Sequence, residues 1–539
     1  MNRSGTATFV LHTHLPYCRL AGNWPHGEEW IHEALLECYL PLIAAFRRLS
    51  SEVAGSIGVT INMTPILTEQ LADPLVLDHF RTYLDDRLGR AEADVERFRS
   101  AGGLRAETAR FHRDRFAAMH DLFEHGLHGD FVGALGELEA GGHLEIATSA
   151  ATHGYLPLLE DDAAVEFQVA TGVQSHLRHF GRAPRSFWLP ECAYKPGVER
   201  ILERHDIRVF FVETHLVTGG ETTRKAAGGM LGLYPAEAPV KANNTNNPHG
   251  TTFQPYFVGD SAVAVIARNE RSGKQVWSAA DGYPGDGAYR EFHKKDDTSG
   301  LHYWRVTGDG IDLGMKEEYD PAAASLAAKN HAQHFVGIVQ EELHTYLLTH
   351  DEPGLLLSAY DTELFGHWWM EGVDWLEATI RRLAEDQTVT LTTAGSYVAA
   401  NPPQQRITLP EGSWGAGGDH RTWSNDTAAW TWPEVHSRQA RAARLLGQDA
   451  RATRQLAREL LLLQASDWQF LMTTGQANEY ATLRFRSHCD RFDALAAAIE
   501  KTSPDLESLV TEYEALDNPF PNIDPRAYRA PSFASMGVR

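Results

Sequence analysis

Short apolar runs recur along the chain, and longer stretches with apolar residues at helical spacing separate them. Such runs, bounded by turn residues, predict β-strands at residues 7–11, 56–61, 143–147, 186–189, 209–212, 355–358 and 389–392. Alternation of strands and helices is typical of a β/α barrel, which presents its chemistry at the C-terminal ends of its strands. We therefore expect residues 1–400 to form a barrel.

Two regions break this alternation. From residue 82 to 140, charged residues lie among sparse apolar ones at helical spacing, which predicts an exposed helical insertion with i, i+4 ion pairs. After Asn401-Pro402-Pro403 the pattern becomes helical, in stretches at 437–446, 451–464, 482–501 and 505–516. Residues 401–539 are therefore predicted to form a C-terminal helical domain packed against the barrel.

A long segment without periodicity lies between residues 216 and 259. Gly-rich and Asn-rich pieces dominate it, including the run at 243–248. A structureless segment of this length inside a compact domain is usually a lid or a disordered loop. It closes with the apolar stretch at 262–267.

Two predicted strands run into carboxylates that are surrounded by aromatic residues. Glu191 follows one strand end, between Trp188 and Tyr194, and the strand at 355–358 leads to Asp361 and Glu363. From the first stretch alone, an ordinary junction of strand and loop explains Glu191 equally well. Two carboxylates on separate strand ends would face each other across a barrel mouth, as glycosidic bond cleavage requires. Spacing leaves both Asp361 and Glu363 as candidates for the second carboxylate.

Composition narrows the class of protein. The 539 residues are 43% hydrophobic and 22% charged, which is ordinary for a globular protein, and the length suggests two or three folding units. The net charge of −23 argues against nucleic acid or an anionic membrane surface as a partner, but not against a neutral polysaccharide. Four scattered cysteines, without CxxC spacing or a signal peptide, indicate reduced thiols in the cytoplasm. No apolar run approaches the roughly 18 residues of a membrane span.

Two histidines close the first predicted strand. His12 and His14 lie at i and i+2, so their side chains point the same way and a metal site is conceivable. No nearby Asp, Cys or third His has ligand spacing. We therefore predict neither a metal nor a cofactor.

Five motifs follow one another along the chain. They are HTHLPY at 12–17, EIAT at 145–148 with THG at 152–154, WLPECAY at 188–194, YDTELFGHWW at 360–369 and GSWG at 412–415. Together they resemble family 57 of the glycoside hydrolases, and more narrowly its 1,4-α-glucan branching enzymes. The resemblance spans nearly the whole chain and implies a distorted (β/α)7 barrel with a helical insertion and a C-terminal α-helical domain. It also implies Glu191 as nucleophile and Asp361 as general acid/base, against Glu363.

The resemblance implies several contacts with the sugar. The segment Leu231-Gly232-Leu233-Tyr234-Pro235 resembles the mobile catalytic loop of the family, whose tip tyrosine would be Tyr234. Glu213 and His215, at the end of the strand at 209–212, are candidates for supporting the site. The predicted substrate-binding residues, including two tryptophans near the first strand, are His12, Trp24, Trp30, His153, Tyr234, Trp277, Trp414, Trp423 and Trp468.

The resulting prediction is an enzyme that cleaves α-1,4 bonds of an α-glucan by a retaining mechanism and transfers the chain to a 6-hydroxyl. An α-amylase or a 4-α-glucanotransferase of the same family would share the first half-reaction, so both remain alternatives. A glucan-binding protein without turnover is the alternative from a different class. The sequence does not determine the oligomeric state or the length of the transferred chain.

Overall fold

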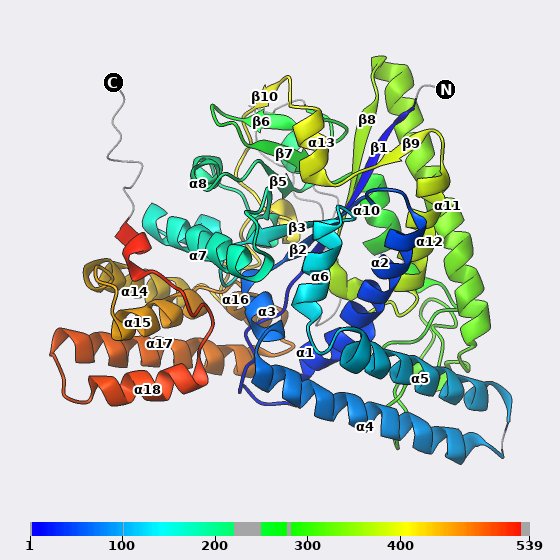
Figure 1. Ribbon diagram of the computed structural model, residues 1–539, viewed down its shortest axis with the longest axis horizontal. Coiled ribbons are helices and arrows are strands. Elements are labelled where there is room, and N and C mark those ends of the chain that lie inside the picture. Colours follow the sequence, from blue (N-terminus) through cyan, green and yellow to red (C-terminus); the bar gives the residue numbers. More distant parts are fainter. Residues whose placement is uncertain (1–2, 101, 220–249, 278–281, 530–539) are drawn as a thin grey trace.

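A curled parallel sheet forms the centre of the molecule (Figure 1). The computed structural model describes residues 3–100, 102–219, 250–277 and 282–529. Within these ranges, seven parallel strands lie in the order β8-β1-β2-β3-β4-β5-β7. Their bounds are β1 Gly5–Thr13, β2 Val59–Met63, β3 Glu145–Ser149, β4 Ser186–Trp188, β5 Val209–Val212, β7 Ala264–Ala267 and β8 Gly354–Asp361. The amide of Asn269 donates to the carbonyl of Leu357 at 2.9 Å and so joins the two end strands into a distorted barrel.

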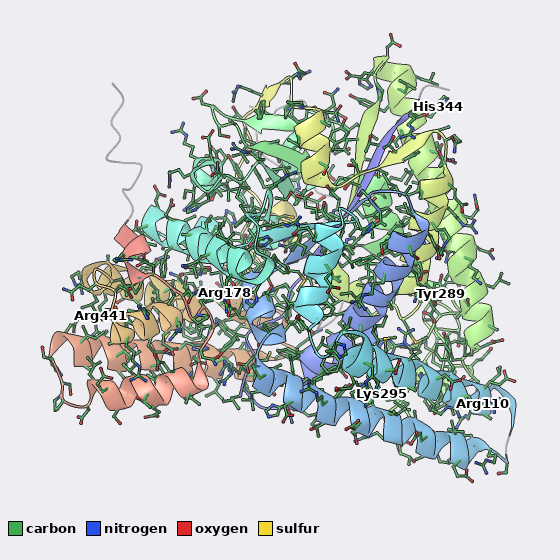
Figure 2. The ribbon with its side chains drawn as sticks, in the orientation of Figure 1. Arg110, Arg178, Tyr289, Lys295, His344 and Arg441 are labelled. Atoms are coloured by element: carbon green, nitrogen blue, oxygen red, sulfur yellow. The ribbon has the colours of Figure 1, made fainter. Side chains whose placement is uncertain are left out.

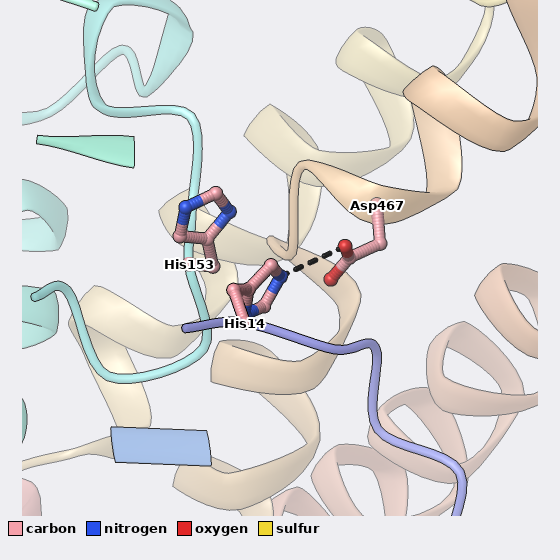
Figure 3. Close-up of side chains that lie close together, drawn as sticks. All are labelled: His14, His153 and Asp467. Atoms are coloured by element: carbon pink, nitrogen blue, oxygen red, sulfur yellow. Dashed lines mark hydrogen bonds and ion pairs between the residues drawn. The ribbon is translucent and has the colours of Figure 1, made fainter. Parts of the chain in front are cut away.

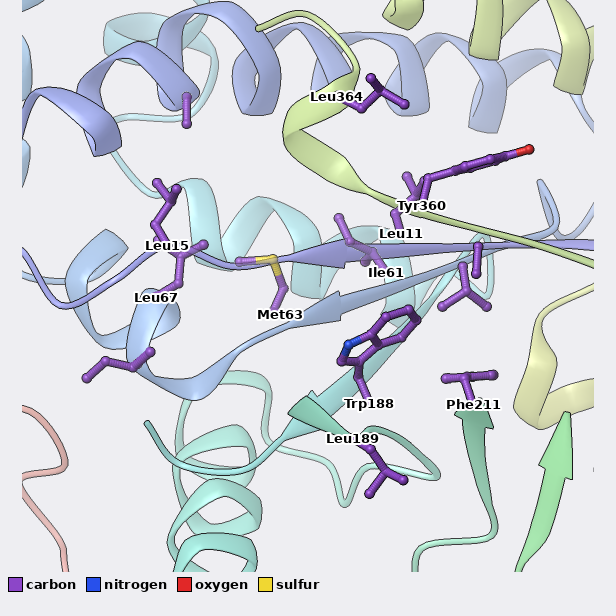
Figure 4. Close-up of a cluster of buried hydrophobic side chains, with 14 of the residues drawn as sticks. Leu11, Leu15, Ile61, Met63, Leu67, Trp188, Leu189, Phe211, Tyr360 and Leu364 are labelled. Carbon is purple, nitrogen blue, oxygen red and sulfur yellow. The ribbon is translucent and has the colours of Figure 1, made fainter. Parts of the chain in front are cut away.

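The barrel strands are buried along almost their whole length, as is usual for a parallel sheet covered by helices. Figure 4 shows buried apolar side chains on the barrel strands, among them Leu11 of β1, Ile61 of β2, Trp188 of β4, Phe211 of β5 and Tyr360 of β8. Three short strands extend this sheet: β6 (Tyr256–Val258) lies antiparallel to β7, β10 (Arg406–Ile407) pairs with β6, and β9 (Val389–Leu391) pairs with β1.

Helices enclose the barrel. They are α1 Glu29–Ala34, α2 Leu40–Glu52, α3 Pro65–Leu71, α6 Phe131–Ala140, α7 Asp162–Phe180, α8 Val198–Arg204, α9 Thr214–Thr218, α10 Glu270–Trp277, α11 Pro321–His350, α12 Gly372–Glu385 and α13 Ala394–Ala400. A π-helical turn, η1 (Leu35–Tyr39), continues directly from α1 into α2. No helix in the described part of the chain is long and apolar enough to cross a membrane.

A long helical hairpin leaves the barrel where the insertion was predicted. It consists of α4 (Pro74–Phe98) and α5 (Gly103–Asp121), which pack along each other (Figure 1). The carboxylate of Asp73 caps α4, so the hairpin begins earlier than residue 82. An i, i+4 ion pair joins Asp86 to Arg90 at 2.7 Å on its surface. The helix α6 instead packs against α2, α7 and β3 as part of the barrel wall.

Helices of the C-terminal region pack beside the barrel (Figure 1). They are α14 Thr431–Leu445, α15 Arg451–Leu463, α16 Asp467–Thr474, α17 Asn478–Glu500 and α18 Leu506–Leu516. The central helix α15 is buried on nearly every side. The rings of Phe167 on α7 and Tyr528 lie 5.5 Å apart and join the two regions. The short helix α16 was not predicted, and the chain stays with the barrel sheet through β10, beyond residue 401.

Candidate active site

Glu191 lies in a tight turn directly after β4. Its φ of 62° and the φ of 48° at Cys192 place both residues in the left-handed region, which is unusual for residues other than glycine. Pro190 ends the strand because it has no N–H to donate. The local sequence thus stops β4 and turns the chain, so that the Glu191 carboxyl group faces inward at the barrel mouth, with a residue exposure of 9%.

Donors from distant segments hold the Glu191 carboxyl group. The indole N–H of Trp414 donates to Oε2 at 2.8 Å, and the hydroxyl of Ser466 donates to Oε1 at 3.2 Å. Nδ1 of His153 lies 3.8 Å from Oε1. Burial raises the pKa of Glu191 to about 7, although the hydrogen bond from Trp414 opposes this shift. This carboxyl group can therefore change its charge near neutral pH.

Asp361 is the last residue of β8, and its backbone is in register with His12 of β1. Burial raises the pKa of Asp361 well above its usual range, and the neighbouring carboxylates of Glu363 and Glu191 raise it further. Arg268 acts in the opposite direction. Asp361 therefore keeps its proton in conditions where an exposed aspartate would lose it.

Glu363, the other candidate for the second carboxylate, is engaged elsewhere. Its Oε1 accepts hydrogen bonds from the Tyr39 hydroxyl at 2.5 Å and from the backbone amide of His14 at 3.2 Å. Tyr39 belongs to the π-helical turn η1, which packs against the turn at 362–364 after β8. These bonds occupy Glu363 in supporting the loop that carries Asp361, even though burial raises its pKa to about 7.

One buried cation completes the barrel side of the site. Arg268 follows β7 and pairs with the carboxylate of Glu213, one of the two candidates for supporting the site. Its guanidinium group lies 6.0 Å from the ring of Trp277 and 5.8 Å from the ring of Trp414. It also donates to the carbonyl of Ala359 at 3.3 Å. Arg268 therefore connects both tryptophans to the strand that carries Asp361.

Figure 3 shows a second polar group, formed by His14, His153 and Asp467. It adjoins Glu191 through His153. His14 Nε2 lies 2.9 Å from Asp467 Oδ1, and the rings of His14 and His153 stack at 3.8 Å with an interplanar angle of 23°. Nearly parallel imidazoles do not direct their lone pairs at one common point, so this geometry fits an ion pair better than a metal site. Burial lowers the pKa of His14, but Asp467, Glu191 and Glu363 together outweigh burial and the net shift is upward.

Several residues expected to contact substrate lie around Glu191. His12 stacks on Trp188 at 4.6 Å and on His153 at 5.0 Å, and Trp277 donates its indole N–H to the carbonyl of Ala359 at 3.4 Å. Together with Trp414, these rings form the wall of the site. The predicted lid tyrosine, Tyr234, lies outside the described residues.

The remaining predicted tryptophans differ in exposure. Trp24 is 78% exposed on the loop before α1. Trp30, Trp423 and Trp468 are buried, and Trp423 stacks on Tyr155 at 4.4 Å. A side chain at Gly415 would overlap the Trp423 ring, with a Cβ at 2.5 Å, so Trp423 packs behind the loop that carries Trp414. All three were predicted to bind substrate, Trp423 and Trp468 in the glucan groove, and in this structure their side chains are buried in the core.

Sequence reasoning missed four residues of the site: Arg268, His14 as an ion-pair partner, Ser466 and Asp467. Arg268 directly follows an apolar strand, which is the signal that identified Glu191 and could have identified it too. Ser466 and Asp467 precede Trp468 in a turn of the C-terminal region, where no local pattern indicates contact with a barrel. Only the tertiary structure places them beside Glu191.

Two buried carboxyl groups with raised pKa, on strand ends of a parallel barrel and walled by aromatic rings, define a carbohydrate-active barrel enzyme. A family model for glycosyl hydrolase family 57 matches residues 8–410, and a model for the C-terminal domain of 1,4-alpha-glucan branching enzymes matches residues 434–528. The chain belongs to glycosyl hydrolase family 57.

Known relatives agree with this assignment. The chain is 41% identical over 541 residues to a 1,4-alpha-glucan branching enzyme of Thermococcus kodakarensis, covering 96% of this chain and 77% of that protein. The crystal structure of the Thermococcus enzyme in complex with glucose superposes with a TM-score of 0.90 at 40% identity, covering 98% of each chain. A branching enzyme of Pyrococcus horikoshii gives 0.87 at 39% identity, covering 98% of this chain and 97% of that chain. The alpha-amylase AmyC of Thermotoga maritima gives 0.85 at 29% identity, covering 98% and 99%.

Proposed function

We propose that this protein is a 1,4-α-glucan branching enzyme, in which Glu191 is the nucleophile and Asp361 the general acid/base. The observation that carries the proposal is the different treatment of the two carboxyl groups. Burial raises the pKa of both groups, but the hydrogen bonds that Trp414 and Ser466 donate to Glu191 oppose this shift and its pKa reaches about 7, whereas neighbouring carboxylates raise the pKa of Asp361 further. Attack requires an anion and protonation of the leaving group requires an acid, so the pair is suited to both roles.

In the first half-reaction, the Glu191 carboxylate attacks the anomeric carbon of an α-1,4-linked glucose. The bond to the leaving oxygen breaks, and the Asp361 proton passes to that oxygen. The product is a β-linked glucosyl ester on Glu191, with the released chain end leaving the site. No cofactor takes part in this scheme.

In the second half-reaction, the 6-hydroxyl of an acceptor glucan attacks the ester. Asp361, now a carboxylate, accepts the hydroxyl proton, and Glu191 is released as an anion. The α configuration is restored because each step inverts the anomeric centre. Water in the acceptor position would give hydrolysis instead, so branching depends on holding the acceptor while water is excluded.

The aromatic wall supports an α-glucan as substrate. Trp277 and Trp414 present flat rings on which sugar rings stack, His12 packs edge-on against Trp414, and His153 lies next to the nucleophile. Trp24 offers an exposed ring at the surface for a longer chain. We assign packing roles to Trp30, Trp423 and Trp468, and Tyr234 keeps its expected role as the lid residue. The four cysteines are free and buried, and we propose that the enzyme works in the cytoplasm.

A single digest tests the proposal. Amylose is incubated with the enzyme, reducing ends are counted, and an α-1,6-specific debranching enzyme is then added. New short chains after debranching show branching, whereas reducing ends alone show hydrolysis, as expected for an α-amylase. Longer linear chains without debranching products would indicate a 4-α-glucanotransferase.

The Glu191→Gln variant is the control for the whole scheme. It removes the nucleophile but keeps the shape and the acceptor of the hydrogen bond from Trp414. Loss of all products with retained binding to amylose supports an enzyme of this mechanism. Equal behaviour of the variant and the parent protein, with no products from either, would indicate a glucan-binding protein without turnover.

A further inference from the structure

Arg268 lies at the seam of the barrel, where the end strands β7 and β8 are joined. Its backbone amide donates to the carbonyl of Val212 at 3.0 Å, and its own carbonyl accepts from the Thr214 hydroxyl at 2.7 Å. The guanidinium group reaches across the seam and donates from Nη1 to the carbonyl of Ala359, two residues before Asp361 on β8. A fixed backbone and a side chain that is only 2% exposed therefore hold this cation beside the end of β8.

A buried acid keeps the cation in place. Nη2 of Arg268 pairs with Oε2 of Glu213, and neither side chain is more than 3% exposed. The other oxygen of Glu213 accepts a hydrogen bond from the backbone amide of Thr214 at 2.9 Å. Because Glu213 follows β5 whereas Arg268 contacts β8, the cationic end of the pair lies toward the strand that carries Asp361.

Within the described part of the chain, Arg268 is the cation that acts on Asp361. Burial lowers the pKa of His12 well below its usual range and raises the pKa of Tyr39 and of Cys192 well above theirs, so these three groups are uncharged near neutral pH. The neighbouring glutamates oppose ionisation of Asp361, and Arg268 favours it. The titratable and charged groups that act on Asp361, feel its charge or lie in register with it are His12, Tyr39, Glu191, Cys192, Arg268 and Glu363.

The second half-reaction needs Asp361 as a carboxylate. The 6-hydroxyl oxygen forms its bond to the anomeric carbon while the bond to Glu191 breaks, the electron pair of that bond returns to Glu191, and the hydroxyl proton passes to Asp361. Glu191 is uncharged in the ester, so Arg268 then acts on Asp361 against less opposition. We propose that Arg268, held by Glu213, is a positioning residue that stabilises the carboxylate of Asp361 for this step. The proposal rests on the roles proposed above for Glu191 and Asp361.

An α-maltosyl fluoride donor tests the proposal. Fluoride leaves without a proton from Asp361, so breakdown of the ester limits kcat, and with maltotriose as acceptor kcat should rise with pH as Asp361 ionises. In Arg268→Gln this acid limb should move upward by about one pH unit, and kcat below the limb should fall about tenfold, because the opposite charge that lowers the pKa of Asp361 is gone. Azide needs no base, so it should restore turnover of Arg268→Gln and give an α-glycosyl azide.

The partner variant separates charge from packing. Glu213→Gln breaks the same buried pair but keeps the cation, so its limb should not move upward, and Arg268→Lys should keep the limb of the parent protein. If Arg268→Gln does not fold, the double variant with Glu213→Gln, which removes both charges, replaces it. The matched control is Arg441→Gln, which breaks an ion pair with Glu500 at 2.8 Å in the C-terminal region, where Figure 2 labels Arg441. Its limb should be unchanged.

The possible failures are distinguishable. An unmoved limb in the folded variants that lack Arg268, an equal upward shift in Glu213→Gln, or no response of Arg268→Gln to azide would overturn the role of Arg268. Failure of the proposed function has a different signature: the parent protein would not turn over the fluoride donor, or azide would not accelerate Asp361→Asn. An upward shift confined to the variants that lack the cation, with rescue by azide and by Arg268→Lys, supports the proposal.

Discussion

Two regions of this molecule bury carboxyl groups beside a histidine, and they differ in their exposure and in whether they lie at the barrel mouth. At the barrel mouth, Glu191 lies beside His14 and Asp467, whose side chains are about 10% exposed. In the C-terminal region, Glu459 of α15, His488 of α17 and Asp517 after α18 form a cluster that is at most 2% exposed. Both groups combine acids with imidazole, but only the first lies beside Glu191 at the strand ends of the barrel.

The histidines of the two clusters also differ in the direction in which their pKa is shifted. The pKa of His14 is raised because Asp467 and nearby glutamates outweigh burial. The pKa of His488 is lowered well below its usual range by burial and by the cations Arg484 and Arg491. Burial raises the pKa of Glu459 well above its usual range. The cluster of Glu459, His488 and Asp517 is sealed from solvent and is thus arranged to hold neutral groups and one ion pair, which suits structural stability. We call it the sealed cluster. The open cluster, at the barrel mouth, retains charge next to Glu191.

The largest expected effect is at the open cluster. Glu191→Gln should reduce turnover of amylose by about 10⁴-fold or more, because the nucleophile is gone. The fold should not lose stability: the raised pKa shows that the folded state disfavours the Glu191 anion, so a neutral residue should keep or raise the melting temperature above pH 7. Reducing-end assays and melting curves on one preparation check both parts. A strongly lowered melting temperature would mean that Glu191 stabilises the fold, which is the role that we expect of the sealed cluster instead.

For the sealed cluster we expect the reverse: a loss of stability with little change in turnover. Asp517→Asn leaves the Arg491 guanidinium without its carboxylate partner, which lies at 2.5 Å, and should destabilise the protein by about 3–5 kcal/mol. Turnover per folded molecule should stay within about twofold. Denaturation and activity measured at a temperature where the variant is folded test this. The double variant with Arg491→Gln should recover part of the loss, and an unchanged melting temperature in Asp517→Asn would contradict the structural role.

A smaller effect should follow from removing one donor to Glu191. Trp414→Phe keeps an aromatic ring but loses the indole N–H, and a hydrogen bond to a charged group contributes about 1.5–3 kcal/mol, so kcat should fall roughly 10- to 100-fold. The matched control is Trp432→Phe, which removes a buried indole donor to the Trp423 carbonyl. Its kcat should be unchanged, and equal losses in both variants would exclude a specific effect on Glu191.

The smallest effect should appear in the pH dependence. The profile of kcat/KM should be bell-shaped, because the pair is active with Glu191 deprotonated and Asp361 protonated, and its acid limb should lie near pH 7. Protonated His14 lowers the pKa of Glu191. His14→Gln should therefore shift the acid limb upward, by up to about one pH unit. His79→Gln, remote from the site and paired with Glu28, serves as control; an acid limb unmoved by His14→Gln would separate the ion pair from catalysis.

Much of the barrel could be predicted because its signals are local. Apolar runs ended by a proline or by polar residues identify buried strands and place Glu191 and Asp361 at their ends, where the structure also has them. Element ends were less certain: β8 runs to Asp361 itself, and α4 begins at Pro74. The burial of Trp423 and Trp468 was not visible either, because a flanking turn does not reveal which ring a neighbouring loop covers.

By itself, the sequence determined the strand ends, the aromatic surroundings and the two candidates for the second carboxylate, since each depends on neighbours within a few residues. The residues left the choice between Asp361 and Glu363 open. In the structure the Tyr39 hydroxyl donates to Glu363 across 324 positions of the chain, which supports our proposal of Asp361 as the second carboxylate. Likewise, Ser466 reaches Glu191 across 275 positions, and Asp467 reaches His14 across 453. Only the tertiary structure decided these contacts, because no local periodicity records which distant helix end packs into a barrel mouth.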